Sequence, residues 1–320
     1  MRRIIIPGSR LERMVGIPAA SWAVNGSSLE KSMRVFADWG VPVAVADQVR
    51  SVHRYFAGVD EARARAVDAF ARDPLVGTLW CARGGSGSVR LLPLLDKWNT
   101  AEALKRDPKL LIGYSDVTGL HLYLHQKLGL PSLHAQMPAT ETFGKLKPRV
   151  STLLKKILAG ELTLGKKSYT NTWNTKALLP VRRDTEGVIM GGNLSVLMSL
   201  IGTPWQPNLR GALLFLEDCA ERPYRVDRML TQLDQAGMLK GVRGVLLGDF
   251  KADVEYKSAK EKTFWKEIFR ERFAPLKIPV LDRLPVGHGK DNDPLPLGVR
   301  AAITKTGKLL LLEQPVKARR

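Results

Sequence analysis

Three side chains that together could perform acyl transfer, a serine, an acidic residue and a histidine, stand at chemically suggestive places in this 320-residue sequence. Ser115 follows a short apolar run and Gly113, and it precedes a segment whose apolar residues recur every three or four positions. This pattern predicts a buried strand, a sharp turn at Ser115 and an amphipathic helix that ends at Gly129. It is the setting of a nucleophile elbow, although no glycine follows at the second position after the serine. The alternative is a serine that only caps the helix.

His288 lies between two glycines, directly after a predicted strand. Histidine has an ordinary pKa near neutrality, which suits a general base, and flanking glycines let backbone and ligand approach closely. Glu217 and Asp218 end another apolar strand, a position that directs a carboxylate off the sheet edge. The order serine, acid, histidine occurs in triad hydrolases. Two alternatives remain: an ordinary exposed loop histidine, and a Glu217 that caps the helix beginning near Pro223 or pairs with Arg222.

A glycine-rich loop, RGGSGS at residues 83–88, follows a predicted strand and precedes a helix. Its consecutive small residues would expose several N–H groups to an anion. The loop lacks the Lys-Ser/Thr pair of a nucleotide-binding P-loop and the GxGxxG spacing of dinucleotide sites. An oxyanion-hole donor or a carboxylate-binding nest suits it better, and a plain tight turn is the alternative.

His121 and His125 lie four residues apart on the predicted helix after Ser115. A helical pair of this spacing can bind zinc, but neither the glutamate of a metalloprotease motif nor a third ligand is present. We therefore expect them to be packing and surface residues, and we predict no metal.

Strands and helices alternate along the first part of the chain, which predicts βαβ units on a parallel sheet. Active sites of such sheets lie at the carboxyl ends of the strands, so the glycine loop and Ser115 should face the same edge. We predict an N-terminal α/β domain over residues 1–142, a linker region over 143–184 with one helix near Val150–Leu158, and a second domain over 185–320. A hairpin is expected at Lys305–Gly307.

The chain carries 50 Lys and Arg against 31 Asp and Glu, a net charge of +19. Such a surplus raises affinity for polyanions, but no recognisable nucleic-acid module accompanies it, so we expect no specific nucleic-acid partner. Two cysteines, Cys81 and Cys219, fit reduced and buried thiols rather than a disulfide framework. No signal-peptide core or membrane span is recognisable, which favours a cytoplasmic protein with no membrane partner.

Five motifs resemble, in the same order, those of the LD-carboxypeptidase family of serine peptidases. They are ARGGSG, LIGYSDVTGL, GGNLSVLMSLIGTPWQP, LFLEDCAERPYRVDRMLTQL and VGHGKDNDPLPLGVRA. This family includes muramoyltetrapeptide carboxypeptidase, and the microcin C self-immunity peptidases are relatives. The resemblance extends from about Val15 to Glu313.

The resemblance implies a catalytic triad with Ser115 as nucleophile, Glu217 as orienting acid and His288 as base. It also implies an oxyanion hole formed by the backbone N–H groups of Gly85 and Asp116. The implied fold is a flavodoxin-like parallel-sheet domain that carries the nucleophile, followed by a smaller β-rich domain, similar to a swivelling β-barrel, that carries the other two residues.

The implied activity is release of the terminal D-alanine from murein tetrapeptides during cell-wall recycling, without a cofactor, by a homodimer. Arg83, Gly84 and Ser86 are the expected contacts to a muropeptide or other small peptide substrate. The chain departs from the family at Ser86, where an aromatic residue is usual, which leaves the substrate preference open. Two alternatives are cleavage of a peptidyl-nucleotide antibiotic and non-catalytic binding of wall fragments or polyanions.

Overall fold

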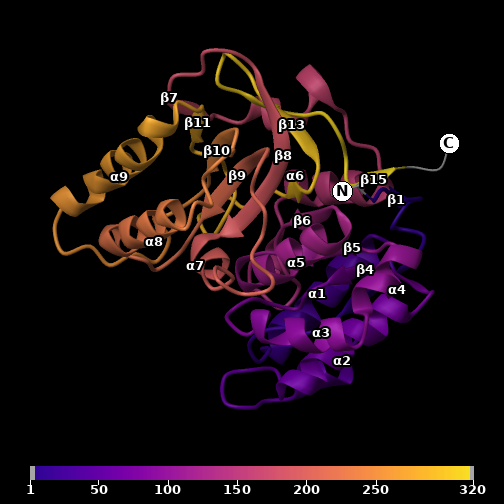
Figure 1. The fold of residues 1–320 in the computed structure, drawn as a ribbon. Coiled ribbons are helices and arrows are strands. Elements are labelled where there is room, and N and C mark those ends of the chain that lie inside the picture. Colours follow the sequence, from indigo (N-terminus) through magenta and orange to yellow (C-terminus); the bar gives the residue numbers. More distant parts are fainter. Residues whose placement is uncertain (1–3, 318–320) are drawn as a thin grey trace. The chain divides into compact units, whose positions relative to one another are not determined.

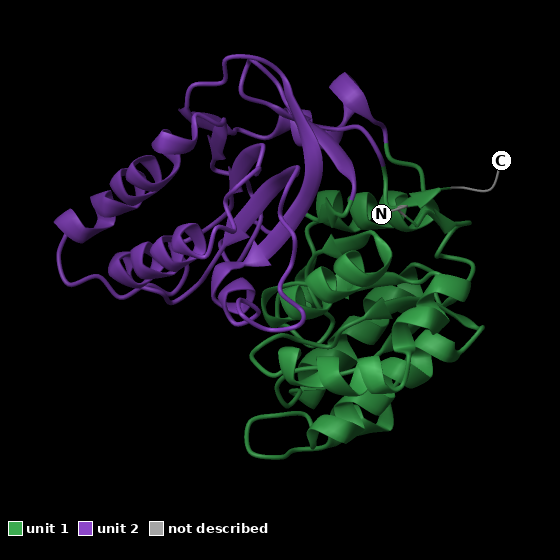
Figure 2. Ribbon diagram, viewed as in Figure 1, with its two compact units in different colours: residues 1–162, 294–298, 314–320 green, residues 163–293, 299–313 purple. Residues whose placement is uncertain are grey.

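The computed structural model describes residues 4–317, which form two compact units (Figure 2). Among the described residues, unit 1 contains residues 4–162, 294–298 and 314–317, and unit 2 contains residues 163–293 and 299–313. The region that the sequence suggests as a linker is divided between the two units at residue 162.

Unit 1 is built on a six-stranded sheet of order β12-β6-β5-β4-β2-β3. Strands β3, β2, β4, β5 and β6 are parallel, and β12 adds an antiparallel edge. Taken in chain order, the five parallel strands have the 2-1-3-4-5 arrangement of a flavodoxin-like sheet, in which the strand order reverses between β2 and β4. The strands are β2 (Met14–Ile17), β3 (Val43–Val45), β4 (Val76–Trp80), β5 (Leu110–Gly113), β6 (Ser132–His134) and β12 (Leu295–Leu297).

Unit 1 has six α-helices among the described residues, and the helix after Ser115 buries eight of its eleven residues, so the prediction that it is amphipathic is wrong. The six helices are α1 (Gly26–Asp38), α2 (Asp60–Arg72), α3 (Leu92–Lys97), α4 (Thr100–Arg106), α5 (Thr118–Leu128) and α6 (Pro148–Ala159). The helix predicted near Val150–Leu158 is therefore confirmed as α6, and Gly129 ends α5 in the left-handed conformation with φ +64°. Short 3-10 turns are η1 (Asp47–Arg50), η2 (Val89–Leu91), η3 (Ser115–Val117) and η4 (Phe143–Lys145). A parallel pair joins β1 (Ile6–Pro7) to β15 (Val316–Lys317).

Unit 2 contains a seven-stranded sheet of order β14-β13-β8-β9-β10-β11-β7. Its four central strands, β8 to β11, are parallel, and the outer three are antiparallel to their neighbours. The strands are β7 (Lys176–Leu179), β8 (Thr185–Asn193), β9 (Ala212–Glu217), β10 (Gly244–Leu247), β11 (Val280–Asp282), β13 (Arg300–Ile303) and β14 (Leu309–Leu311). The predicted fold class, a parallel-sheet α/β domain followed by a β-rich domain, is confirmed, and so is the hairpin between β13 and β14.

The helices of unit 2 are α7 (Leu194–Met198), α8 (Pro223–Gln235) and α9 (Phe264–Phe273), with 3-10 turns η5 (Gly165–Lys167), η6 (Tyr169–Thr172), η7 (Lys260–Thr263) and η8 (Ala274–Leu276). Helices α8 and α9 pack against each other (Figure 1). Pro223 begins α8 as predicted, because the missing N–H of proline costs nothing at the first helical position. Across residues 4–317, no helix combines the length and the apolar character that a membrane span requires.

Candidate active site

Ser115 occupies a strained turn between a strand and a helix of unit 1. Its φ is +60°, in the left-handed region that a non-glycine residue adopts only when its surroundings impose it. Strand β5 ends two residues earlier, and η3 and α5 follow directly. Val117, not Ser115, is the N-cap of α5, and neither η3 nor α5 has a side-chain capping bond. The serine therefore does not cap the helix, and the turn has the form of a nucleophile elbow.

His121 fixes the strand side of this turn. Its ring is buried, and its Nε2 lies 3.0 Å from the carbonyl oxygen of Gly113, two residues before Ser115. Burial lowers the pKa of His121 to about 4, so the ring stays neutral near pH 7. The predicted packing role of His121 is confirmed. In the described part of the chain, no group of three or more His, Cys, Asp or Glu side chains is arranged to hold a metal ion.

The glycine loop that follows β4 lies directly against Ser115. A Cβ placed on Gly84 would come within 2.8 Å of Ser115 Cβ and 3.0 Å of its Oγ, closer than side-chain carbons approach in proteins. Gly85, with φ +117°, adopts a conformation that favours glycine. The structure thus brings together Gly84, Gly85 and Ser115, as expected for loops that leave neighbouring parallel strands at their carboxyl ends.

The carboxylate of Asp116 ties three loops together beneath the serine. It is buried, and its Oδ2 accepts hydrogen bonds from Ser21 Oγ at 2.5 Å and from the backbone N–H of Ser88 at 2.8 Å. Ser88 Oγ also donates to the carbonyl oxygen of Asp116. Burial raises the pKa of Asp116, while these hydrogen bonds oppose the rise. Sequence reasoning considered only the backbone N–H of this residue and missed its side chain.

Arg83 and Ser86 lie on either side of the two central glycines of this loop. Arg83 Nη1 donates to the carbonyl oxygen of Ala23 at 2.9 Å, and its guanidinium lies 5.7 Å from the centroid of the Trp22 ring. Ser86 is exposed. The roles of Arg83, Gly84 and Ser86 in substrate binding stay predictions. Sequence reasoning missed Trp22, which lies in the loop after β2. Its aromatic ring packs against Gly85 of the glycine loop, whose own position 86 is a serine.

Glu217 and His288 meet in unit 2. Glu217 is the last residue of β9 and is fully buried, and its Oε2 lies 2.6 Å from His288 Nδ1. The side chain of His288 is 14% exposed, so it is not an ordinary surface histidine. Arg222, the alternative partner of Glu217, instead lies 3.8 Å from Glu255. The acid and the histidine are therefore paired as an orienting acid and a base require.

The charge of Glu217 changes the acidity of His288. Burial of the ring opposes protonation, but the nearby negative charge of Glu217, together with hydrogen bonds to Cys219 and Glu217, raises the pKa of His288 well above its ordinary value. A buried carboxylate favours the charged imidazolium in this way because little water screens the pair. The pKa near neutrality that an isolated loop histidine would have is thus not retained.

Glycines allow the loop that carries His288 to approach the end of β9. Gly287 has φ +127°, and a Cβ there would lie 3.0 Å from Glu217 Oε2. A Cβ on Gly289 would lie 3.0 Å from the side chain of Asp249. The loop is closed by Asn292 Oδ1, which accepts from the backbone N–H of Gly287 at 3.2 Å. This confirms the expectation that glycines permit a close approach here.

Asp218 organises the turn that follows Glu217. Its carboxylate is buried and accepts from Asn193 Nδ2 at 2.9 Å, from Ser195 Oγ at 2.6 Å, and from the backbone N–H groups of Ser195 and Cys219 at 2.9 Å each. Burial raises the pKa of Asp218, opposed by the hydrogen bonds of Ser195. Cys219 is a free thiol as predicted, but it is only partly buried, because it lies beside His288 at the rim of this turn. Cys81 is free and fully buried.

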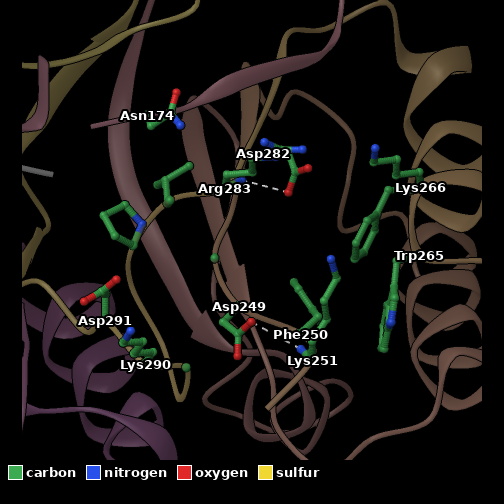
Figure 3. A pocket seen from close by; sticks show the side chains of 15 residues that line it. Asn174, Asp249, Phe250, Lys251, Trp265, Lys266, Asp282, Arg283, Lys290 and Asp291 are labelled. Carbon is green, nitrogen blue, oxygen red and sulfur yellow. Dashed lines mark hydrogen bonds between the residues drawn. The ribbon is translucent and has the colours of Figure 1, made fainter. Parts of the chain in front are cut away.

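A cavity of about 450 Å³ lies on unit 2 beside the His288 loop (Figure 3). Gly289, Lys290 and Asp291 of that loop form one wall, and the carboxyl ends of β10 and β11 form another. Four basic side chains line the cavity: Lys251, Lys266, Arg283 and Lys290. Within residues 4–317, none of the four lies within ion-pair distance of a carboxylate. Three aspartates, Asp249, Asp282 and Asp291, also line the cavity, so its lining carries both signs of charge with an excess of only one positive charge.

The predicted triad draws its residues from both units. Ser115 belongs to unit 1, and Glu217 and His288 belong to unit 2. The two halves are each well formed, and their joint action stays a prediction.

Comparison with known proteins identifies both halves of the chain. Residues 15–135 match the LD-carboxypeptidase N-terminal domain, and residues 186–303 match the LD-carboxypeptidase C-terminal domain. A "Probable murein peptide carboxypeptidase" of Bacillus subtilis is 30% identical over 307 residues, covering 94% of this chain and 92% of that protein. The microcin C7 self-immunity protein MccF of Escherichia coli is 28% identical, covering 78% of this chain and 77% of that protein.

Solved structures agree with these matches. A muramoyltetrapeptide carboxypeptidase from Oxalobacter formigenes has a TM-score of 0.75 at 31% identity, covering 93% of this chain and 97% of that one. MccF in complex with glutamyl sulfamoyl guanosine has a TM-score of 0.83 at 22% identity, covering 98% of this chain and 100% of that one, a likeness of fold.

Proposed function

The chain belongs to the LD-carboxypeptidase family of peptidases, and we propose that it is a serine L,D-carboxypeptidase that releases the terminal D-alanine from murein tetrapeptides. The observation that carries the proposal is the pair of half-sites: a strained Ser115 against a glycine loop, and a buried Glu217 paired with His288 at 2.6 Å. The murein-directed names of the Bacillus and Oxalobacter relatives support the substrate.

In the proposed reaction, the neutral imidazole of His288 takes the proton of Ser115 as its Oγ attacks the carbonyl carbon of the penultimate residue. The C–O bond forms as the carbonyl π bond opens, which places a negative charge on the carbonyl oxygen. Glu217 orients the imidazole and stabilises the imidazolium that results. Collapse of the intermediate breaks the C–N bond, and His288 returns the proton to the departing D-alanine. Water then repeats the sequence on the acyl-enzyme and frees the tripeptide.

Two backbone N–H groups, those of Gly85 and Asp116, are the proposed donors to the oxyanion. Removal of one such donor costs about 3–4 kcal/mol of transition-state stabilisation in comparable enzymes. Asp116 holds this arrangement through its side chain, because its bonds to Ser21 and Ser88 fix the glycine loop relative to the elbow.

Positive charge supports an anionic substrate. A murein tetrapeptide carries free carboxylates, and the chain has a net charge of +19. A field of this sign raises the local concentration and the association rate of anions, and salt screens it. Arg83 is the proposed ligand of the terminal carboxylate, since a guanidinium can bind both carboxylate oxygens at once.

The direct test is mass spectrometry of a defined murein tetrapeptide after incubation with the enzyme. We expect loss of one alanine with the wild type and no loss with Ser115→Ala. Undiminished release by pure Ser115→Ala would refute the nucleophile. If the wild type binds the peptide but releases nothing, the chain is a binding protein for wall fragments.

The likeness to MccF makes a peptidyl-nucleotide antibiotic the second candidate substrate. Turnover of the tetrapeptide and of an aminoacyl sulfamoyl adenosine, measured side by side, distinguishes the two. Faster turnover of the adenosine compound would favour the second candidate.

A further inference from the structure

Trp22 and Tyr55 form an exposed aromatic corner beside the glycine loop in unit 1. Trp22 lies in the loop after β2 and is 39% exposed, and Tyr55 lies in the loop after η1 and is 53% exposed. Their ring centroids are 6.1 Å apart, with an angle of 62° between the planes. Large aromatic side chains gain most by burial, so a pair left in solvent beside a nucleophile is a candidate binding surface.

The corner is held rigidly. A Cβ on Gly85 would lie 2.3 Å from Trp22 Cγ, so this ring lies directly on the loop backbone. The backbone N–H of Trp22 donates to the carbonyl oxygen of Gly84 at 3.3 Å, and that of Ala23 donates to Tyr55 at 2.9 Å. A ligand that stacks here would therefore meet a preorganised surface and lose little affinity to side-chain ordering.

The distance between the aromatic corner and the nucleophile Ser115 is limited by the glycine loop between them. Gly84 and Gly85 are neighbours, and a Cβ on each would lie 2.8 Å from Ser115 Cβ and 2.3 Å from Trp22 Cγ, so at most about 12 Å separates these two side-chain atoms. Three residues separate the scissile carbonyl of a murein tetrapeptide from the sugar that carries the peptide, and an extended chain covers about 10 Å in three residues. The sugar is thus the part of the substrate that reaches this corner.

The geometry of the two rings favours a sugar over a nucleobase. The rings meet at 62° rather than forming two parallel faces, whereas a flat base gains most from a slot between parallel faces.

We propose that Trp22 and Tyr55 form a subsite that stacks on the sugar ring of a glycan-linked peptide, so that the enzyme prefers sugar-linked tetrapeptides over free ones. This specificity proposal rests on the proposed function of the same site.

The test compares two substrates, a free tetrapeptide and the same tetrapeptide linked to N-acetylmuramic acid, by D-alanine release. The wild-type ratio of kcat/KM, sugar-linked over free, should be about three- to tenfold, the contribution of one aromatic face, and should arise in KM. In Trp22→Leu the ratio should fall to about one, and Trp22→Phe should recover most of it. Trp98→Leu is the matched control, because Trp98 also has an arginine over its ring, 5.0 Å from Arg65.

Calorimetric binding of both peptides to Ser115→Ala, with and without Trp22→Leu, provides a readout that needs no turnover. The subsite proposal is refuted if the wild-type ratio of kcat/KM, sugar-linked over free, is one, or if this ratio is unchanged in Trp22→Leu. This holds even if the variant loses activity on both substrates. Failure of the wild type to release alanine, with the binding preference intact, refutes the proposed function and leaves the subsite standing. If Trp22→Leu loses affinity only for an aminoacyl sulfamoyl adenosine, the ligand of the subsite is a nucleobase and the proposal of a sugar is wrong.

Discussion

Substitution of Gly84 by alanine should disable the nucleophile without unfolding the protein. The added Cβ would lie 2.8 Å from Ser115 Cβ and 3.0 Å from Ser115 Oγ, whereas carbon atoms in contact are normally about 3.5–4.0 Å apart. The elbow or the glycine loop must therefore move by about 1 Å. Gly84 is not among the residues with positive φ, so alanine adds a contact but no backbone strain. A displacement of this size costs about 100-fold in rate, or about 2.7 kcal/mol of activation free energy.

The assay is steady-state release of D-alanine from a tetrapeptide, with kcat and KM determined separately, and thermal unfolding as the check on folding. Gly84→Ala should lower kcat by about 100-fold and should slow labelling of Ser115 by a fluorophosphonate. Gly26→Ala is the matched control, because a Cβ there meets nothing within 4 Å. A kcat for Gly84→Ala within threefold of the wild type would refute the view that the glycine loop positions the serine.

Three further predictions follow from the same geometry. Because Glu217 raises the pKa of His288, kcat/KM of the wild type should rise with pH through an apparent pKa above the ordinary value of about 6.5. In Glu217→Gln the charge that opposes burial is lost, so the apparent pKa should fall relative to the wild type, with a loss of up to about 10⁴-fold in rate. An unshifted pH profile would contradict the pairing. The pKa of His121 is lowered to about 4 in the folded state, so the unfolded state binds the proton first as the pH falls. The free energy of unfolding should therefore fall by up to about 3 kcal/mol as pH drops from 6.5 to 4. Chemical denaturation across this pH range should show a smaller fall in His121→Gln. Finally, kcat/KM for an anionic peptide should fall, with kcat unchanged, as salt rises from about 0.01 to 1 M and the Debye length shortens from about 30 to 3 Å. Salt-independent kinetics would contradict the role of the net charge of +19 in substrate association.

Local patterns predicted the nucleophile half of the fold well. The apolar run before Ser115 and the helical periodicity after it identify β5 and α5, and the left-handed Gly129 ends α5 as expected. Such features depend on residues close together in sequence, where strand, turn and cap preferences act directly. The same holds for the hairpin between β13 and β14, whose turn contains Gly307 with φ +74°.

Local sequence patterns did not predict the contacts between segments that lie far apart in the chain. Strand β12 pairs with β6 of unit 1 although it follows almost all of unit 2 in the chain. The side chain of Asp116 reaches Ser21, 95 residues away, and Trp22 lies on Gly85. Each depends on which strands become neighbours in the sheet, a consequence of topology rather than of periodicity.

The most direct test of the central claim, that Ser115 and His288 act as one catalytic unit, is a double-mutant comparison of D-alanine release. Residues that act in the same step give non-additive losses, because removal of either already abolishes that step. Ser115→Ala, His288→Ala and the double variant should therefore all retain the same residual rate. A double variant that is slower than each single variant by the full product of the two losses would contradict the claim.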